Sequence, residues 1–299
     1  MTIPVFMELV EMKAKTASVL PFLIGLCFSS YYYGSIHPLL LVLFFISMFL
    51  FNMFVDIWNN YNDYHRALDK EYQYQTNIIG REKLSLKQIE GLMAVFLLSS
   101  AFIGFYLAWL VGWPILLMGG FCYAVGIFYS SGSRPLSSLT LGEFFSGFTM
   151  GFMITLICVY LNTYELFEWR FQNLWSIFLI SLPNTLWIAN LMLANNLCDK
   201  EEDEKNHRYT LVHYIGTRGS LLLFTLLTIL AFVAIILEYL FGLAPATILL
   251  TLLMIPFVYQ QTKLLWLKQV KKETFVCGIR ILAVGSFLQA FTYFLGMIF

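Results

Sequence analysis

The sequence predicts an all-α integral membrane protein with nine transmembrane helices. Of its 299 residues, 59% are hydrophobic and 12% are charged, whereas soluble globular proteins carry about 25% charged residues. The apolar residues gather in blocks of about 20, the length needed to cross a hydrocarbon layer of about 30 Å. The formal net charge is zero. Together these features exclude a soluble enzyme, a secreted disulfide scaffold, a disordered chain and a nucleic-acid binder.

The nine predicted helices follow the apolar blocks along the chain. Short breaks with turn residues and no charged side chain, such as Gly112-Trp113-Pro114, separate some of them. The expected helices lie at about 17–34, 38–58, 92–111, 113–130, 141–162, 173–197, 219–240, 243–263 and 279–298.

The distribution of Lys and Arg predicts the orientation of these helices. With nine spans, 17 of the 18 basic residues fall on one side of the membrane, and only Arg170 falls on the other. The positive-inside rule makes the crowded side cytoplasmic, so we expect a cytoplasmic N-terminus and an external C-terminus. The basic residues Lys268, Lys271 and Lys272 are expected to meet anionic lipid headgroups.

The chain is predicted to form a single membrane domain over residues 1–299, because no linker is long enough to separate soluble domains. None of the five cysteines forms a C-x-x-C pair, so neither a disulfide framework nor a metal knuckle is indicated. The N-terminal segment lacks the basic region of a signal peptide, which predicts that the first apolar block is retained. The inward N-terminus is typical of a bacterial cytoplasmic membrane protein.

Two stretches rich in Asn and Asp follow the cytoplasmic ends of two apolar helices, in loops at about 56–91 and 195–218. In the first stretch, the spacing i, i+3, i+4 and i+7 places four oxygen-bearing side chains on one helical face. These four are Asp56, Asn59, Asn60 and Asp63. In the second stretch, a shared face is predicted for Asn195, Asn196, Asp199 and Asp203.

Carboxylates at the edge of a membrane are costly unless they are paired or coordinated. Oxygen ligands without His or Cys favour a hard cation such as Mg²⁺, which fills its remaining positions with water and substrate phosphate. Basic residues are interleaved with both stretches. Carboxylates, metal and basic side chains together can hold a diphosphate and neutralise the charge on a leaving group.

The paired motifs resemble those of the UbiA family of intramembrane aromatic prenyltransferases. They read N-x-x-x-D-x-x-x-x-x-D from Asn59, and N-N-x-x-D-x-x-x-D-x-x-x-x-R-x-T-L from Asn195. The resemblance covers the whole chain and implies the family's all-α fold, with nine helices around a central cavity. The segments Lys13–Gly25 and Tyr129–Glu143, with the second motif, are most similar to the members that prenylate 1,4-dihydroxy-2-naphthoate in menaquinone synthesis.

Carried over residue by residue, the resemblance implies two Mg²⁺ ions bridged by the diphosphate of a polyprenyl donor. The implied metal ligands are Asn59, Asp63, Asp69, Asn195, Asp199 and Asp203, and catalysis would depend most on Asp63 and Asp199. Asn60 stands where many members have Asp, so Asp56 is either an extra metal ligand or a residue that orients Asn59. The residues implied to contact the diphosphate are Lys13, Lys15, Arg81, Lys83, Lys205 and Arg208.

The implied reaction is transfer of the allylic polyprenyl group to the aromatic acceptor, which loses its carboxylate as CO₂ to give a demethylmenaquinol. Tyr129 and Arg134 lie on a further cytoplasmic loop and are expected to orient the acceptor, since Arg suits bidentate carboxylate binding. Within the family, 4-hydroxybenzoate, a lipid alcohol or another quinone precursor remain open as acceptors.

A cation-coupled transporter is the main alternative from another class. Such a protein needs acidic groups near the middle of the bilayer. Here the carboxylates of the two motifs lie at helix ends beside basic residues, and the middles of the predicted spans contain almost no ionisable residue. A member of the family without activity is disfavoured because the second motif keeps both aspartates.

Overall fold

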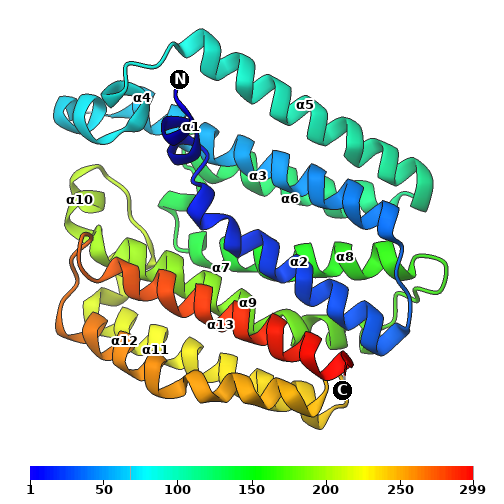
Figure 1. The fold of residues 1–299 in the computed structure, drawn as a ribbon. Helices are drawn as coiled ribbons and strands as arrows, with labels where there is room; N and C mark the ends of the chain where they lie inside the picture. The colour runs from blue at the N-terminus through cyan, green and yellow to red at the C-terminus, as the bar shows by residue number, and fades with distance from the viewer. Residues whose placement is uncertain (68, 299) are drawn as a thin grey trace. The chain divides into compact units, whose positions relative to one another are not determined.

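The computed structural model describes residues 1–67 and 69–298 of the chain. The regular elements of these ranges are all helices, with no strand among them, which confirms the all-α prediction (Figure 1). Within the same ranges, eight helical segments are long and apolar enough to cross a membrane. They are Met12–Tyr33, Pro38–Arg66, Leu86–Val111, Gly142–Thr163, Phe171–Cys198, Leu211–Leu240, Ala246–Leu267 and Phe275–Ile298. The helix predicted at 113–130 is present as Pro114–Ser130, which has 17 residues and is shorter than these eight, so the count of nine spans stays a prediction.

The chain divides into two compact units. Unit 1 comprises Met1–Thr16 and Pro38–Ser137, and unit 2 comprises Ala17–His37 and Ser138–Phe299. The first predicted motif lies in unit 1 and the second in unit 2.

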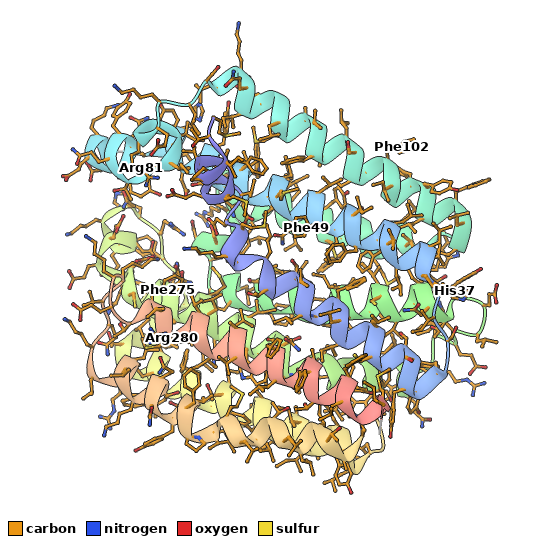
Figure 2. The ribbon with its side chains drawn as sticks, viewed as in Figure 1. His37, Phe49, Arg81, Phe102, Phe275 and Arg280 are labelled. Atoms are coloured by element: carbon orange, nitrogen blue, oxygen red, sulfur yellow. The ribbon has the colours of Figure 1, made fainter. Side chains whose placement is uncertain are left out.

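Unit 1 is built on three apolar helices that pack against one another, α3 (Pro38–Arg66), α5 (Leu86–Val111) and α6 (Pro114–Ser130) (Figure 1). The shorter elements are α1 (Ile3–Leu9), η1 (Met12–Lys15), η3 (Tyr72–Thr76) and α4 (Ile78–Arg81). Its core includes the fully buried Ile57 of α3 together with Leu9, Ile79 and Ile89. Opposite this core, Phe102 points outward from α5 and is 75% exposed (Figure 2), as expected for a side chain in contact with lipid.

In unit 2, α9 (Phe171–Cys198) contacts most of the other long elements. The elements packed on it are α7 (Gly142–Gly147), the π-helical η5 (Phe148–Met153), α8 (Ile154–Thr163), α11 (Leu211–Leu240) and α13 (Phe275–Ile298). The remaining elements of unit 2 are α2 (Thr16–Phe28), η2 (Ser29–Tyr33), α10 (Lys200–Lys205), η6 (Ala246–Met254) and α12 (Ile255–Leu267). The short η4 (Leu136–Ser138) spans the point along the chain where unit 1 ends and unit 2 resumes. α11 is interrupted at Gly216, whose φ of 69° is readily adopted only by glycine.

Several helices differ in length from the apolar blocks that predict them. α3 continues to Arg66 instead of ending near 58, and α5 begins at Leu86 instead of 92. Most of the added residues are polar, and a helix projecting beyond the apolar layer can carry them at little cost because its backbone hydrogen bonds are internal. The helix predicted at 243–263 instead begins as the 3₁₀ segment η6 and becomes α12 at Ile255, where Pro256 cannot donate the backbone hydrogen bond that a continuous α-helix needs.

One acidic side chain is fully buried inside unit 2. Glu238 of α11 has no exposed surface and accepts hydrogen bonds from Gln289 Nε2 at 3.0 and 3.3 Å. Gln289 Oε1 in turn accepts from Asn184 Nδ2 at 2.7 Å. Because α11 ends at Leu240, this carboxyl lies at a helix end and not at the middle of the span, which agrees with the sequence argument against a cation pathway.

Close backbone packing joins η5 and α7 to α9. A Cβ atom on Gly151 would lie 2.5 Å from Thr185 Cα, and one on Gly147 would lie 2.5 Å from the Thr185 carbonyl oxygen. Small residues spaced four apart allow helices in membranes to approach in this way, because lipid provides little hydrophobic force between them.

We expect Gly151→Ala to lower the stability of the detergent-solubilised protein by about 1–3 kcal/mol, because the added methyl group meets backbone atoms that must shift. The matched control is Gly104→Ala in α5, where a Cβ has no neighbour within 4 Å. Thermal unfolding followed by circular dichroism would show a lower Tm for the first variant only. Equal Tm values for the two variants would refute this account of the packing.

Candidate active site

The first motif lies on the last turns of α3 and in the segment that follows. Asn59 is half-buried, and its Oδ1 is a buried oxygen with no hydrogen-bond partner. Asp63 is exposed one turn further along the same helix, and Asp69 is exposed beyond the end of α3. Asp69 Oδ1 accepts a hydrogen bond of 2.8 Å from the Glu71 backbone N–H. The structure therefore places Asn59 and Asp63 on α3 itself, in agreement with the helical face predicted from their spacing, although the helix was expected to end near 58.

Asp56 is paired with a lysine from the N-terminal segment. Lys15, at the end of η1, is 3% exposed, and its Nζ donates to Asp56 Oδ2 and to Asn52 Oδ1, the latter at 2.5 Å. The side chain of Asn60 is turned to the helix backbone, where its Nδ2 donates to the Asp56 carbonyl at 3.0 Å. Lys15, predicted to contact diphosphate, and Asp56, predicted to bind metal or orient Asn59, thus neutralise each other.

Hydrogen bonds hold the segments around the first motif in place. Asn77 is buried, caps α4 through its side chain, and donates from Nδ2 to the Asn60 carbonyl at 2.9 Å. Arg66 donates to the carbonyls of Ser130 and Gly132, both at 3.0 Å, and so joins the end of α3 to the end of α6. The two residues expected to orient the aromatic acceptor lie in the same region. Tyr129 is half-buried on α6, and Arg134 is exposed after the end of this helix.

The second motif begins at the end of α9 and is bridged by a lysine as well. Lys271 Nζ donates to Asn195 Oδ1 at 2.5 Å and to Asp199 Oδ2. Lys271 belongs to the segment between α12 and α13, and the sequence predicted it to face lipid headgroups. No sequence pattern pointed to this contact, because Asp199 and Lys271 are far apart along the chain.

Asn196, the neighbour of Asn195, has a different partner. It is 4% exposed and donates from Nδ2 to Glu143 Oε1 at 2.9 Å. Glu143, at the start of α7, is 5% exposed, and its Oε2 has no hydrogen-bond partner. The predicted common face of Asn195, Asn196, Asp199 and Asp203 is therefore divided: Asn195 and Asp199 contact Lys271, whereas Asn196 contacts α7.

Asp203 lies on α10, a short helix separate from α9, and is 5% exposed. Burial raises the pKa of this carboxyl from 3.8 to about 6, although the nearby positive charge of Arg208 lowers it. Arg208 Nε lies 3.4 Å from Asp203 Oδ1, whereas Oδ2 is buried with no hydrogen-bond partner. Lys205, on the same short helix, is exposed.

The remaining basic residues predicted to bind diphosphate are exposed in unit 1. Arg81 forms ion pairs with Glu8 at 2.7 Å and Glu82 at 3.1 Å, and the hydrogen bonds that its guanidinium donates to these carboxylates raise its pKa. Lys13 and Lys83 are exposed, and Lys83 has a φ of 50°. Figure 2 shows Arg81 at the end of α4 in unit 1.

The residues of both motifs fit a hard divalent cation in their chemistry. Their donors are amide and carboxylate oxygens, the ligands that Mg²⁺ prefers. Two of these oxygens, Asn59 Oδ1 and Asp203 Oδ2, are buried without a hydrogen-bond partner, a state that costs free energy unless a cation or water completes it. In the described part of the chain, three or more His, Cys, Asp or Glu side chains do not cluster as a preformed metal site.

The fold and the site define a multi-pass membrane protein with an oxygen-rich motif in each of its two units. The profile of the UbiA prenyltransferase family matches residues 18–291. The 1,4-dihydroxy-2-naphthoate octaprenyltransferase of Bacillus subtilis (strain 168) is 27% identical over 257 residues, which are 86% of this chain and 80% of that protein.

Two solved structures share the fold. A UbiA homologue from Aeropyrum pernix K1 in its apo form has a TM-score of 0.71 at 18% identity, with 95% of this chain and 96% of that chain covered. A UbiA homologue from Archaeoglobus fulgidus, bound to GPP and Mg²⁺, has a TM-score of 0.63 at 14% identity, with 99% and 100% covered. The chain belongs to the UbiA prenyltransferase family and is a membrane prenyltransferase.

Because burial raises the pKa of Asp203, we expect the stabilisation of the protein by Mg²⁺ to depend on pH. The pKa of this carboxyl is about 6 in the folded protein, above its ordinary value of 3.8, so its protonated form stabilises the folded state. This stabilisation is lost as the pH rises through about 6. Above this pH the ionised carboxylate is open to a cation, whereas below it a proton competes and weakens metal binding by up to about tenfold per pH unit. The rise in Tm on adding Mg²⁺ and inorganic diphosphate should therefore be large at about pH 7.5 and small at about pH 5.

Asp203→Asn should reduce this pH dependence, because its amide does not titrate in the range and only the protonation of diphosphate itself then remains. Glu202→Gln is the matched control, since Glu202 is an exposed neighbour on the same helix. If the Asn variant kept the pH dependence of the wild type, Asp203 would not be the titrating ligand.

Proposed function

We propose that this prenyltransferase uses Mg²⁺ to transfer a polyprenyl group from polyprenyl diphosphate to 1,4-dihydroxy-2-naphthoate, giving a demethylmenaquinol. The observation that carries the choice of acceptor is the similarity over 257 residues to a protein named for this reaction. The similar segments Lys13–Gly25 and Tyr129–Glu143 support the same acceptor. The two motifs support the metal and the diphosphate donor, because their side chains combine oxygen ligands with basic groups.

Each motif is proposed to supply ligands for Mg²⁺. The proposed ligands are Asn59, Asp63 and Asp69 in unit 1, and Asn195, Asp199 and Asp203 in unit 2. When bound, Mg²⁺ supplies positive charge that stabilises the departing diphosphate. Asp56 is left out of the ligand set, because Lys15 already neutralises it.

The protein's own groups would then hold the donor and protect the reaction from water. Lys205 and Arg208 follow the second motif, and Lys13, Arg81 and Lys83 are the corresponding candidates in unit 1. As the allylic C–O bond breaks, the diphosphate keeps the bonding electrons, and apolar surroundings protect the electron-poor allylic carbon until the acceptor ring attacks. Tyr129 and Arg134 are proposed to orient the acceptor through its hydroxyl and carboxylate groups.

We further propose that the whole chain is one catalytic domain with its N-terminus in the cytoplasm. The family profile includes residues of both units, which supports a single domain. The concentration of 17 of the 18 basic residues on one predicted side supports this orientation in a cytoplasmic membrane.

Prenyl transfer by the purified protein in detergent tests this function. With radiolabelled farnesyl diphosphate and Mg²⁺, we expect a prenylated product and release of CO₂ from 1,4-dihydroxy-2-naphthoate, and no product from 4-hydroxybenzoate or in EDTA. Asp63→Asn and Asp199→Asn should each lower kcat/KM by at least about 100-fold, because each removes a charge that supports the transition state.

Glu165→Gln is the control, because this exposed carboxylate lies outside both motifs. Turnover with another acceptor alone would keep the reaction class and overturn the menaquinone assignment. Full activity of either Asn variant would remove that residue from the proposed site.

A further inference from the structure

The two units contain the same arrangement of an Asn, an Asp four residues later, and a lysine from a distant segment. In both, lysine Nζ contacts the Asn Oδ1 at 2.5 Å and an oxygen of the Asp carboxylate. The residues are Asn52, Asp56 and Lys15 in unit 1, and Asn195, Asp199 and Lys271 in unit 2. An ammonium group here occupies two oxygens of the kind that coordinate a hard cation.

The two lysines differ in their exposure. The side chain of Lys15 is 4% exposed, whereas that of Lys271 is 44% exposed. Removing a buried charge from its partner leaves an uncompensated charge and is strongly destabilising. An exposed lysine loses little on leaving its partner, because water solvates the freed ammonium. Lys15 is therefore a fixed counter-ion, and Lys271 is an exchangeable one.

The segment that carries Lys271 is anchored by contacts that do not involve the Lys271 side chain. Val270 N–H donates to Thr274 Oγ1 at 3.0 Å, and Thr274 N–H donates to the Val270 carbonyl at 2.8 Å. Thr274 is 7% exposed and lies 3.8 Å, Oγ1 to Sγ, from Cys198 at the end of α9. Lys271 Nζ also lies 4.7 Å from the centroid of Phe275, which is labelled in Figure 2 at the start of α13. The ammonium can thus leave Asp199 without unfolding its loop.

We propose that Lys271 is an internal cation that holds Asn195 and Asp199 in the metal-free protein and is displaced onto the diphosphate when Mg²⁺ binds these oxygens. This inference rests on the proposed function, which makes Asn195 and Asp199 metal ligands. The sequence alone assigns Lys271 to lipid headgroups. Its contacts with Asn195 and Asp199 make it a positioning residue for the second motif, and the proposed displacement makes it a later partner of the donor's diphosphate.

This exchange couples the binding of the metal ion to the binding of diphosphate. Without diphosphate, a metal ion must displace Lys271 and leave its ammonium with water alone. With diphosphate present, the displaced ammonium gains an anionic partner, so each ligand strengthens the binding of the other. Direct coordination of the metal by diphosphate adds coupling that does not involve the lysine, so the comparison between variants isolates the contribution of Lys271.

Mn²⁺ binding to the full-length protein in detergent tests the proposal without turnover. The free ion is measured by its electron paramagnetic resonance signal, with and without inorganic diphosphate. In the absence of diphosphate, Lys271→Met should bind Mn²⁺ more tightly than wild type, by about 5- to 150-fold, the range of typical coupling between two binding sites. The gain in Mn²⁺ affinity on adding diphosphate should be smaller for this variant than for wild type. Lys271→Arg, which keeps the charge, should stay closer to wild type.

Lys272→Met is the matched control, because it removes the same charge from an exposed neighbour. Equal effects of the two Met variants, weaker Mn²⁺ binding by Lys271→Met, or no Mn²⁺ binding by wild type under either condition would each overturn the proposal. A failure to prenylate 1,4-dihydroxy-2-naphthoate, with the Mn²⁺ results as expected, would overturn the proposed function and leave the exchange of Lys271 in place.

Lys15→Met provides the contrast expected of a fixed counter-ion. It leaves Asp56 as a buried carboxylate without its ammonium partner, so we expect a lower Tm in EDTA than for wild type. Lys271→Met should change Tm less than Lys15→Met does. A larger loss of Tm for Lys271→Met would contradict the assignment of Lys271 as the exchangeable lysine.

Discussion

The cost of an unpaired charge at the edge of a membrane is the constraint on which the site depends. An isolated carboxylate on a transmembrane helix is strongly disfavoured. Asp56 on α3 and Asp199 at the end of α9 each meet this cost through a lysine from a distant segment. The helices that carry the motifs can therefore extend polar side chains beyond their apolar surfaces, and in each unit a lysine pairs with one of these aspartates without metal.

The same constraint explains where polar groups occur elsewhere in unit 2. Glu238 is buried with Gln289 and Asn184 in one hydrogen-bonded chain, and α9 approaches η5 closely at Gly151. Burial of a polar group without partners would cost more than such a network, because no water is present to replace them. A frame of close-packed helices then supports motif residues at the helix ends.

The sequence predicted the helices well because each needs a long apolar run, but it misjudged their ends. Residues Asp56–Arg66 resemble a loop in composition, yet the helix continues through them. The motif residues were identifiable from spacing, whereas their partners were not. Asn52 lies within an apolar run, and the contact of Lys271 with Asp199 joins segments remote in sequence. Only the fold brings such pairs together, since a single sequence records composition and spacing and not proximity.

A site for a highly charged donor must be stable both empty and occupied. Carboxylates that attract Mg²⁺ repel one another and the diphosphate when the metal is absent, so an empty site needs a substitute cation. A buried lysine such as Lys15 stays paired with its aspartate, here Asp56, so that this aspartate is not open to the metal. An exposed lysine can leave its aspartate and return, because water or the incoming anion solvates or pairs with the released ammonium group. The different exposure of Lys15 and Lys271 thus gives similar arrangements in the two units different uses, one for stability and one for exchange.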